Sequence, residues 1–429
     1  MSALRTPGRN PSARLQESLR ELRDRLSPRR LLRLIPPAAP TLRPDASLAV
    51  LDVTKYYGDT TGGVRTYLNE KSAYIAARPA LRHVLVVPGA ADEVHDGEGI
   101  RTYRLAGPPI PTQSPYRFLH SAESLRRIVL HERPDLIEIG SPFLVPWVVR
   151  RATRGLDRPL VWFYHGNVPR LISQHPGHDG ALRAAGHRLA WSYVRRVSRL
   201  VRATLVASDF VGADLEREGV ANAVRVPLGV DLQRFTPDRR ERRSLVREAL
   251  GLGDAPLALY CGRFAREKHL DVLIRAWPAV ERKTGARLAL VGDGPSAAWF
   301  RALPGADRVT WLPFERDRER LADLLAAADL YVAPGPAETF GLAALEALAS
   351  GTPVLTVDSG GVPELVRRSG AGAVYAVGDE GSLADAATAL LGGDLAALGR
   401  RGREYAVREH EWSAVFDRIF AVYRSVLAA

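Results

Sequence analysis

Two glutamates stand eight positions apart in a segment whose residues predict a loop followed by a helix. Glu338 lies just before the expected helix, and Glu346 lies inside it. The helix is expected because apolar residues recur at helical spacing, namely Leu342, Leu345 and Leu348. Eight residues of helix cover on the order of 12 Å, about the span from a sugar ring across a diphosphate to a ribose. The two carboxylates could therefore bind the two ends of one nucleotide sugar.

Backbone N–H groups at the start of this helix would add an anion site between the carboxylates. The first turn of a helix leaves N–H groups without intrahelical partners, and these groups attract anions. We expect the N–H groups of Phe340, Gly341 and Leu342 to be of this kind. The alternative for Glu346 is an ordinary solvated residue of an amphipathic helix.

The residues around both glutamates resemble the Glu-x7-Glu signature of the retaining, family-four glycosyltransferases, which have two Rossmann-like domains (the GT-B architecture). The flanking segments that match that family are Pro334-Gly-Pro336, Thr339-Phe-Gly341 and Gly360-Gly-Val-Pro-Glu364. The resemblance implies that Glu346 holds the ribose hydroxyls and that Glu338 holds the hydroxyls of the transferred sugar.

A second group of charged residues follows the expected strand 257–260. Arg263 and Lys268 match the Gly-Arg-x4-Lys element of the same family, which implies that both cations hold the donor diphosphate. A leaving nucleoside diphosphate gains negative charge in the transition state, and fixed cations stabilise that charge without a metal. Arg266 lies in the same loop and is not expected to contribute. The alternative for Lys268 is a solvated position in the first turn of a helix.

A glycine pair, Gly62 and Gly63, separates the expected strand 47–53 from the expected helix 64–77. Glycines at such a turn let the backbone approach a ligand and place N–H groups at a helix start. The resemblance implies that this loop lies near the donor phosphates and the acceptor. The alternative is a plain tight turn.

One of the ten histidines, His165, directly follows the expected strand 160–164. Open α/β sheets bind ligands at the carboxyl ends of their strands. The family carries a functional histidine after the corresponding strand, so the resemblance implies that His165 contacts the transferred sugar and helps to shape the reaction centre. A purely structural role is the alternative.

Strand and helix patterns alternate along most of the 429 residues, which predicts parallel sheets covered by helices on both faces. We expect an α/β protein of two Rossmann-like domains that face each other across a cleft holding the active site. The expected parts are a basic N-terminal tail (1–45), an N-terminal Rossmann-like acceptor domain (46–229), a linker (230–255), a C-terminal Rossmann-like nucleotide-sugar donor domain (256–408) and a C-terminal helix that crosses back to the first domain (409–429).

The formal net charge of +12 favours anionic partners. Leucines and arginines alternate at helical spacing between Ser12 and Leu34, and 181–202 reads as an arginine-rich helix. Each segment is either solvated or in contact with an anionic membrane surface. No run has the roughly 18 apolar residues of a membrane span, and no secretory signal is visible. We expect a cytoplasmic protein, with peripheral attachment to the inner face of the cell membrane as the extension, and no nucleic-acid partner.

Neither a metal nor another cofactor is expected. The chain has a single cysteine and no Asp-x-Asp sequence, and the spacing of His175, His178 and His187 fits no tetrahedral site. A nucleotide-diphosphate sugar is expected as substrate.

The resemblance therefore predicts a retaining, metal-independent glycosyltransferase. The first loop and the His165 region look most like actinobacterial mannosyltransferases that build glycolipids, which favours mannose as the sugar and a lipid-linked or glycan acceptor. One alternative keeps the fold but uses a UDP-sugar and a small soluble acceptor. An alternative of another class is a non-catalytic protein that binds polyanions through its positive charge.

Overall fold

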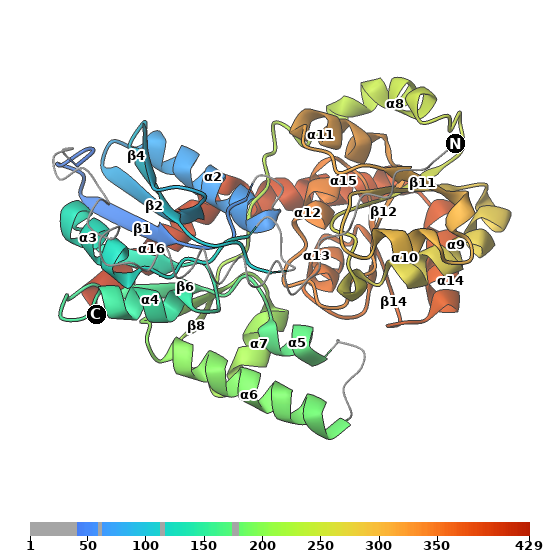
Figure 1. Ribbon diagram of the computed structural model, residues 1–429. Coiled ribbons are helices and arrows are strands. Elements are labelled where there is room, and N and C mark those ends of the chain that lie inside the picture. Colours follow the sequence, from blue (N-terminus) through green and yellow to red (C-terminus); the bar gives the residue numbers. More distant parts are fainter. Residues whose placement is uncertain (1–40, 59–61, 112–115, 174–179) are drawn as a thin grey trace, which may run out of the picture. The chain divides into compact units, whose positions relative to one another are not determined.

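The computed structural model describes residues 41–58, 62–111, 116–173 and 180–429 (Figure 1). The helix expected between Ser12 and Leu34 lies outside the described residues, as do most of the expected basic tail and the two histidines His175 and His178.

The first sheet has the strand order β3-β4-β2-β1-β5-β6-β7-β8. Its elements and their neighbours are β1 Leu48–Val53, α2 Gly63–Ala76, β2 Leu81–Gly89, β3 Glu93–Gly97, β4 Ile100–Ala106, α3 Ala122–Glu132, β5 Leu136–Ile139, α4 Val145–Ala152, β6 Leu160–Phe163, α5 Val168–Ser173, α6 Gly180–Ser198, β7 Ala203–Val206, α7 Asp209–Arg217 and β8 Ala223–Arg225.

The second sheet has the strand order β11-β10-β9-β12-β13-β14, and its paired strands are parallel. The remaining elements are η1 Pro237–Arg242, α8 Arg243–Ala249, β9 Leu257–Cys261, η2 Arg266–Lys268, α9 Leu270–Thr284, β10 Arg287–Val291, α10 Ala297–Arg301, η3 Ala306–Arg308, β11 Val309–Leu312, α11 Arg318–Ala327, β12 Leu330–Ala333, α12 Leu342–Ala349, β13 Val354–Val357, α13 Val362–Ser369, β14 Gly372–Tyr375, α14 Glu380–Leu391, α15 Leu395–Glu409 and α16 Trp412–Ala428.

The predicted class of two parallel-sheet α/β domains is confirmed. The chain forms two compact units. The first takes in the described residues up to Phe163 together with Val197–Ala203 and Ser425–Ala429, and the second takes in Tyr164–Arg196 and Thr204–Arg424 within the described residues. Both units owe their strands to short runs of valine, leucine and isoleucine that are buried on both faces, as parallel sheets require.

Two helix layers enclose the second sheet, with α9, α10 and α14 on one face and α11, α12 and α15 on the other (Figure 1). The first layer buries Trp277 of α9 completely, and its indole N–H donates to the carbonyl of Ala286 at 3.1 Å. A buried indole needs such a partner, because an unpaired polar group would oppose folding.

One strand was not predicted from the sequence. β3 pairs antiparallel with β4 at the edge of the first sheet, and all of its residues are exposed. It consists of Glu-Val-His-Asp-Gly, so it has no apolar face that a pattern could reveal. Charged edge strands of this kind discourage pairing with other chains.

The segment expected as a linker is ordered as η1 and α8, and it packs against α11. Arg243 and Arg247 both donate to the carboxylate of Asp329, which also accepts from the N–H of Leu257 at 2.8 Å. The charged run between Asp238 and Arg247 is therefore bound to the second sheet through ion pairs.

A buried charge cluster fixes α2 to the first sheet. The ammonium of Lys71 is fully buried and lies 2.9 Å from the Asp52 carboxylate and 3.3 Å from that of Glu138. His83 Nε2 lies 2.5 Å from Asp52. Burial by itself would raise the pKa of Asp52, but Lys71 and His83 outweigh it and hold that pKa below its usual range. The helix that begins at Gly63 is thus anchored by charge.

Replacing Lys71 by methionine should lower the free energy of unfolding by about 3–5 kcal/mol, because it leaves two buried carboxylates without their cation. Urea denaturation would measure the loss. The matched control is Lys283→Met, which breaks an exposed ion pair with Asp385 and should cost less than about 1 kcal/mol. Equal losses in the two variants would show that the buried cluster does not hold the fold.

Candidate active site

The expected site residues of the second unit gather at the carboxyl ends of neighbouring parallel strands. Arg263 and Lys268 follow β9, Glu338 follows β12, and the Gly360–Gly361 turn follows β13. Since these three strands are adjacent in the sheet, their loops meet at one edge, where open α/β sheets bind ligands.

Glu338 and Lys268 form an ion pair. The Lys268 ammonium lies 2.5 Å from Glu338 Oε1, and both side chains are partly exposed. A Cβ at Gly335 would make only ordinary contacts, at 3.5 Å from Lys268 Cα and 3.6 Å from Glu338 Cγ, so this approach does not require a glycine there. A partly exposed ion pair contributes little to stability, so each partner can take a new partner from a ligand at small cost.

Arg263 extends into solvent, with 61% of its side chain exposed, and it donates to Glu267, four residues further along the chain. Arg266 makes a different contact: its guanidinium lies 3.2 Å from the centre of the Trp299 ring. The two arginines of this loop therefore differ: Arg263 is mostly exposed, whereas Arg266 is engaged in a cation–π contact.

A close approach of two backbones fixes the loop that carries Glu338. The N–H of Gly361 donates to the carbonyl of Glu338 at 2.7 Å. A Cβ at Gly361 would lie only 2.5 Å from the carbonyl oxygen of Thr339, and Gly360 adopts φ +94°, which favours glycine. The glycine pair is thus required by contact between the loops after β12 and β13.

Helix α12 begins two residues later than expected. Gly341 has φ 91° and caps the helix, so the first helical residue is Leu342. A left-handed residue cannot belong to a right-handed helix, which places Phe340 and Gly341 before the helix. Phe340 is buried, and its ring centre lies 5.7 Å from that of His410.

The backbone of His165 lies beside the same loop. The hydroxyl of Thr339 donates to the carbonyl of His165 at 2.9 Å, and the hydroxyl of Ser208 donates to the carbonyl of Thr339 at 2.6 Å. Glu364 supports this junction, because its carboxylate accepts from the N–H groups of Asp209 and Phe210 in the first turn of α7. The backbone of His165 is therefore joined to the loop that carries Glu338 through Thr339.

Glu346 lies in the second turn of α12 and is 5% exposed. Its Oε1 accepts from Arg318 Nη2 at 2.6 Å. Burial raises the pKa of Glu346 above its ordinary value, and the charge of Arg318 and its hydrogen bond oppose that rise. The carboxylate is thus held in a dry environment by one guanidinium.

Gly62 and Gly63 belong to the first unit. Gly63 is the first residue of α2, and Gly62 precedes it. A Cβ at Gly62 would meet nothing within 4 Å among the described residues, so packing does not demand a glycine there.

Within the described parts of the chain, no three His, Cys, Asp or Glu side chains are grouped so that they could hold a metal ion.

Three contacts of the candidate site were not predicted from the sequence. Thr339 was noticed only as part of a motif, whereas Ser208 and Arg318 were not singled out. Ser208 and Arg318 lie far from Thr339 and Glu346 in sequence, so no local spacing could reveal these pairs.

Comparison with known proteins supports the predicted fold and family. Residues 255–392 match the family model for glycosyl transferases group 1, and residues 61–234 match the model for glycosyltransferase family 4. Sucrose-phosphate synthase from Thermosynechococcus elongatus has the same fold, with a TM-score of 0.73 and 24% identity over 89% of this chain and 99% of that one. The fold and the matched models define a glycosyltransferase of GT-B architecture.

Two relatives indicate which type of glycosyltransferase this chain resembles. A GDP-mannose-dependent α-(1-6)-phosphatidylinositol dimannoside mannosyltransferase of Mycobacterium tuberculosis is 33% identical over 327 residues, which are 74% of this chain and 82% of the relative. A GDP-mannose-dependent α-mannosyltransferase of the same species is 30% identical over 343 residues, 78% of this chain and 84% of the relative. The chain belongs to the family-four glycosyltransferases and is of the actinobacterial mannosyltransferase type.

Gly361→Ala should destabilise the protein by about 1–3 kcal/mol, because the added methyl group forces the loops after β12 and β13 apart. Chemical denaturation would measure the change. Gly392→Ala is the control, since a Cβ there makes only an ordinary contact of 3.5 Å with Thr388 O. If both variants unfold at the wild-type midpoint, the close approach does not constrain the Glu338 loop.

Proposed function

We propose that the protein transfers a hexose, with mannose favoured, from a nucleotide-diphosphate sugar to a hydroxyl of a lipid-linked or glycan acceptor, with retention of the anomeric configuration. The observation that carries this proposal is the Lys268–Glu338 ion pair at the carboxyl ends of β9 and β12. Relatives whose names specify GDP-mannose support the choice of donor.

Donor binding would replace the ion pair by two new contacts. Hydroxyls of the sugar would donate to Glu338, and the diphosphate would accept from Lys268 and from the exposed Arg263. Glu346 would hold the ribose, and the N–H groups at Phe340, Gly341 and Leu342 would face the phosphates. Each carboxylate would then accept hydrogen bonds from hydroxyls, and each cation would face phosphate oxygens.

Fixed cations would stabilise the leaving group. As the bond between the anomeric carbon and the diphosphate oxygen breaks, negative charge develops on the diphosphate, beside Lys268 and Arg263. We therefore propose that the reaction needs no metal and no other cofactor. We also propose that the Gly62–Gly63 turn at the start of α2 offers backbone N–H groups to the donor phosphates and the acceptor.

Retention would follow from attack on the face that the diphosphate leaves. The acceptor oxygen forms the new bond to the anomeric carbon, and its proton passes to the departing diphosphate oxygen. His165 would lie beside the anomeric carbon, and the Thr339 hydroxyl holds its backbone in place. No side chain of the protein is assigned as a base in this scheme.

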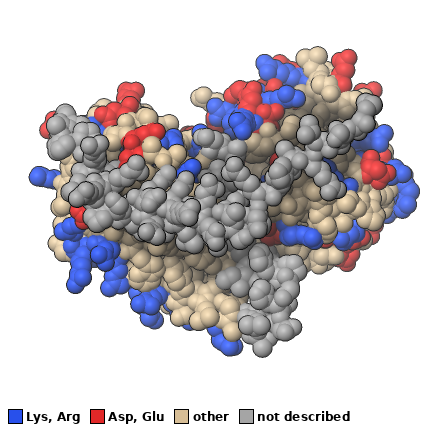
Figure 2. Space-filling view, in the orientation of Figure 1, with Lys and Arg blue, Asp and Glu red and all other residues tan. Residues whose placement is uncertain are grey.

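Helix α6 suggests how a lipid acceptor would be reached. Leu189 is 71% exposed, the exposed Arg196 follows seven positions later on the same face of the helix, and the exposed Arg199 lies just beyond the end of the helix. Figure 2 shows basic side chains along the lower edge, where α6 lies in Figure 1. No helix in the described parts of the chain has the length and apolarity to cross a membrane. We propose a cytoplasmic enzyme attached peripherally to the inner face of the cell membrane.

Removing either cation of the diphosphate clamp should abolish most activity. Lys268→Ala and Arg263→Ala each delete a charge-assisted contact worth roughly 1.5–3 kcal/mol, so kcat/KM with GDP-mannose should fall by about tenfold or more. The control is Arg266→Ala, whose guanidinium is engaged with Trp299 and whose loss should be mild. An essential Arg266 beside a dispensable Lys268 would refute the clamp.

Transfer from UDP-sugars alone would favour the alternative donor and a small soluble acceptor.

Replacing the two glutamates should have different effects on nucleotide affinity and on kcat. Glu346→Gln should weaken the binding of free GDP as well as of the donor, because it acts on the ribose. Glu338→Gln should leave GDP affinity unchanged and lower kcat, because it acts on the sugar. Titration calorimetry and steady-state kinetics would separate these effects. Equal losses of GDP affinity would contradict this division of roles.

Vesicle sedimentation should show binding to anionic phosphatidylglycerol vesicles, little binding to neutral phosphatidylcholine vesicles, and release at high salt. Each arginine near an anionic surface adds on the order of 1 kcal/mol, so Arg196→Glu and Arg199→Glu should weaken binding. Arg282→Glu on α9 makes the same change of charge and is the control. If anionic vesicles bind no more protein than neutral ones, the arginines do not attach the protein to the membrane; if neither kind binds, a soluble acceptor is favoured.

A further inference from the structure

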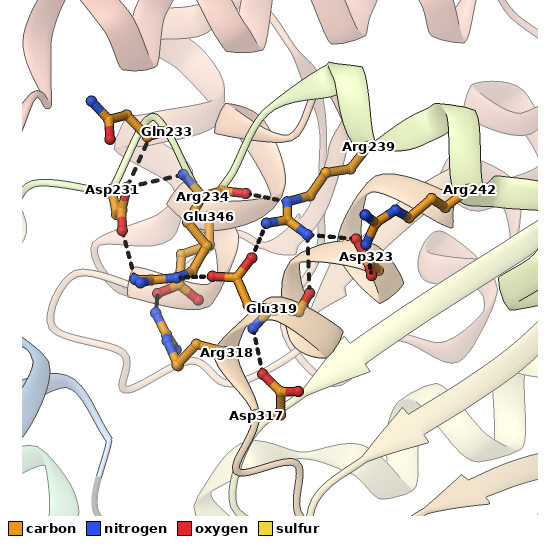
Figure 3. A network of polar contacts seen from close by, with 10 residues as sticks. All are labelled: Asp231, Gln233, Arg234, Arg239, Arg242, Asp317, Arg318, Glu319, Asp323 and Glu346. Carbon is orange, nitrogen blue, oxygen red and sulfur yellow. Dashed lines mark hydrogen bonds and ion pairs between the residues drawn. The ribbon is translucent and has the colours of Figure 1, made fainter.

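Glu346 and Arg318 form a close pair that joins α12 to the start of α11 (Figure 3). Arg318 is the first residue of α11, and Glu346 is 5% exposed. Arg318 Nη2 donates to Glu346 Oε1, and among the described residues no group is bonded to Oε2. One oxygen of the carboxylate is thus bonded to Arg318, and the other accepts no hydrogen bond from the described residues.

A polar network holds the first turn of α11 in position (Figure 3). Asp317 caps the helix by accepting from the N–H of Glu319 at 2.9 Å. The Glu319 carboxylate in turn accepts from Arg234 at 2.8 Å and from Arg239. Arg239 also donates to Asp323 at 2.6 Å. The segment before α8 and the start of α11 are therefore bound together by alternating charges.

The guanidinium of Arg318 is restrained on two sides. It donates to Glu346 and lies 5.0 Å from the ring centre of Phe235, which is fully buried. Phe235 itself belongs to the segment that the network fixes. The orientation of Arg318, and with it that of the Glu346 carboxylate, is therefore set by the fold.

Burial would otherwise favour the protonated form of Glu346. A protonated carboxyl can accept fewer hydrogen bonds from a pair of ribose hydroxyls, because one of its oxygens carries a proton. The charged and titratable groups that interact electrostatically with the Glu346 carboxylate are Arg318, Arg234, Asp231 and Cys261, and Arg403 of α15 also contacts α12. Of these, Arg318 makes the hydrogen bond, Asp231 opposes ionisation, and Arg403 donates to the carbonyl of Ala349 at the far end of the helix.

We propose that Arg318 is a positioning residue for the donor ribose, which keeps Glu346 ionised and directs its second oxygen towards the two ribose hydroxyls. This inference rests on the proposed role of Glu346 in donor binding. Arg318 contacts no reacting atom and acts only by positioning Glu346. Replacing Arg318 is therefore expected to change the affinity for the nucleotide.

Titration calorimetry of the full chain with GDP, and in parallel with UDP, between pH 5.5 and 8.5 tests this role. Arg318→Met removes the charge and keeps an apolar contact with Phe235. It should weaken binding by about tenfold or more at pH 7. Because the pKa of Glu346 rises without Arg318, affinity should also begin to fall at a higher pH than in the wild type as the pH is lowered. Arg318→Lys should restore most of the affinity and the wild-type pH profile, since it returns the charge.

Arg320→Met is the matched control on the same helix, because Arg320 is 69% exposed and pairs only with Glu315 among the described residues. It should bind GDP as the wild type does at every pH. The double variant Arg318→Met/Glu346→Gln should bind no more weakly than Glu346→Gln alone, since both changes disable one carboxylate. Should Arg318→Met fail to fold, Arg318→Gln takes its place, with the same expectations.

Each outcome decides between distinct conclusions. Wild-type affinity and pH profile in the neutral Arg318 variants, with a loss in Glu346→Gln, would overturn the role of Arg318 and leave the donor site intact. A loss of affinity with an unchanged pH profile and no rescue by lysine would reduce Arg318 to a structural residue. If Glu346→Gln binds GDP and UDP as the wild type does, the proposed donor site itself is wrong.

Discussion

The candidate active site depends on the close backbone approach between Gly360–Gly361 and the loop that carries Glu338. A side chain at Gly361 would collide with the carbonyl of Thr339, so only glycine lets the Gly361 N–H reach the carbonyl of Glu338. This bond fixes the loop from which Glu338 reaches Lys268. Thr339, the next residue, then binds the carbonyl of His165. One constraint thus places a carboxylate, a cation and a histidine near one another, although they come from three distant parts of the chain.

The two glutamates have the same chemistry but different surroundings, which suits them to different roles. Glu338 is partly exposed and pairs with a flexible lysine, so a ligand can exchange with either partner. Glu346 is buried, and its partner Arg318 is held by a network of ion pairs that includes Glu319, Arg234 and Arg239 (Figure 3). A buried carboxylate that lost its cation would tend to take up a proton. Under the proposed mechanism, the first arrangement would permit exchange of partners during catalysis, and the second would keep the Glu346 carboxylate in place for binding.

Short-range patterns predicted much of the fold, because buried parallel strands consist of continuous apolar runs. The expected strand 257–260 lies within β9, and the glutamate motif lies on α12 and the loop before it. Contacts between distant residues were not predictable. Lys71 is one of four lysines in the sequence, and only the fold shows that it is buried between two carboxylates. Arg318 is likewise one arginine in a charged run, and its pairing with Glu346 depends on how α11 and α12 pack. The strand β3 was missed because it has no apolar face.

Titration calorimetry of the wild-type protein with GDP and UDP in the presence of EDTA tests the central claim most directly, namely that the loops after β9 and β12 form a metal-independent site for a nucleoside diphosphate. The account predicts saturable binding of one nucleotide per chain, with little dependence on salt. The absence of saturable binding for both nucleotides, or binding that requires a divalent metal, would contradict it. Steeply salt-dependent binding of polyanions in place of nucleotides would indicate that the positive charge of the protein, rather than a donor site, is responsible.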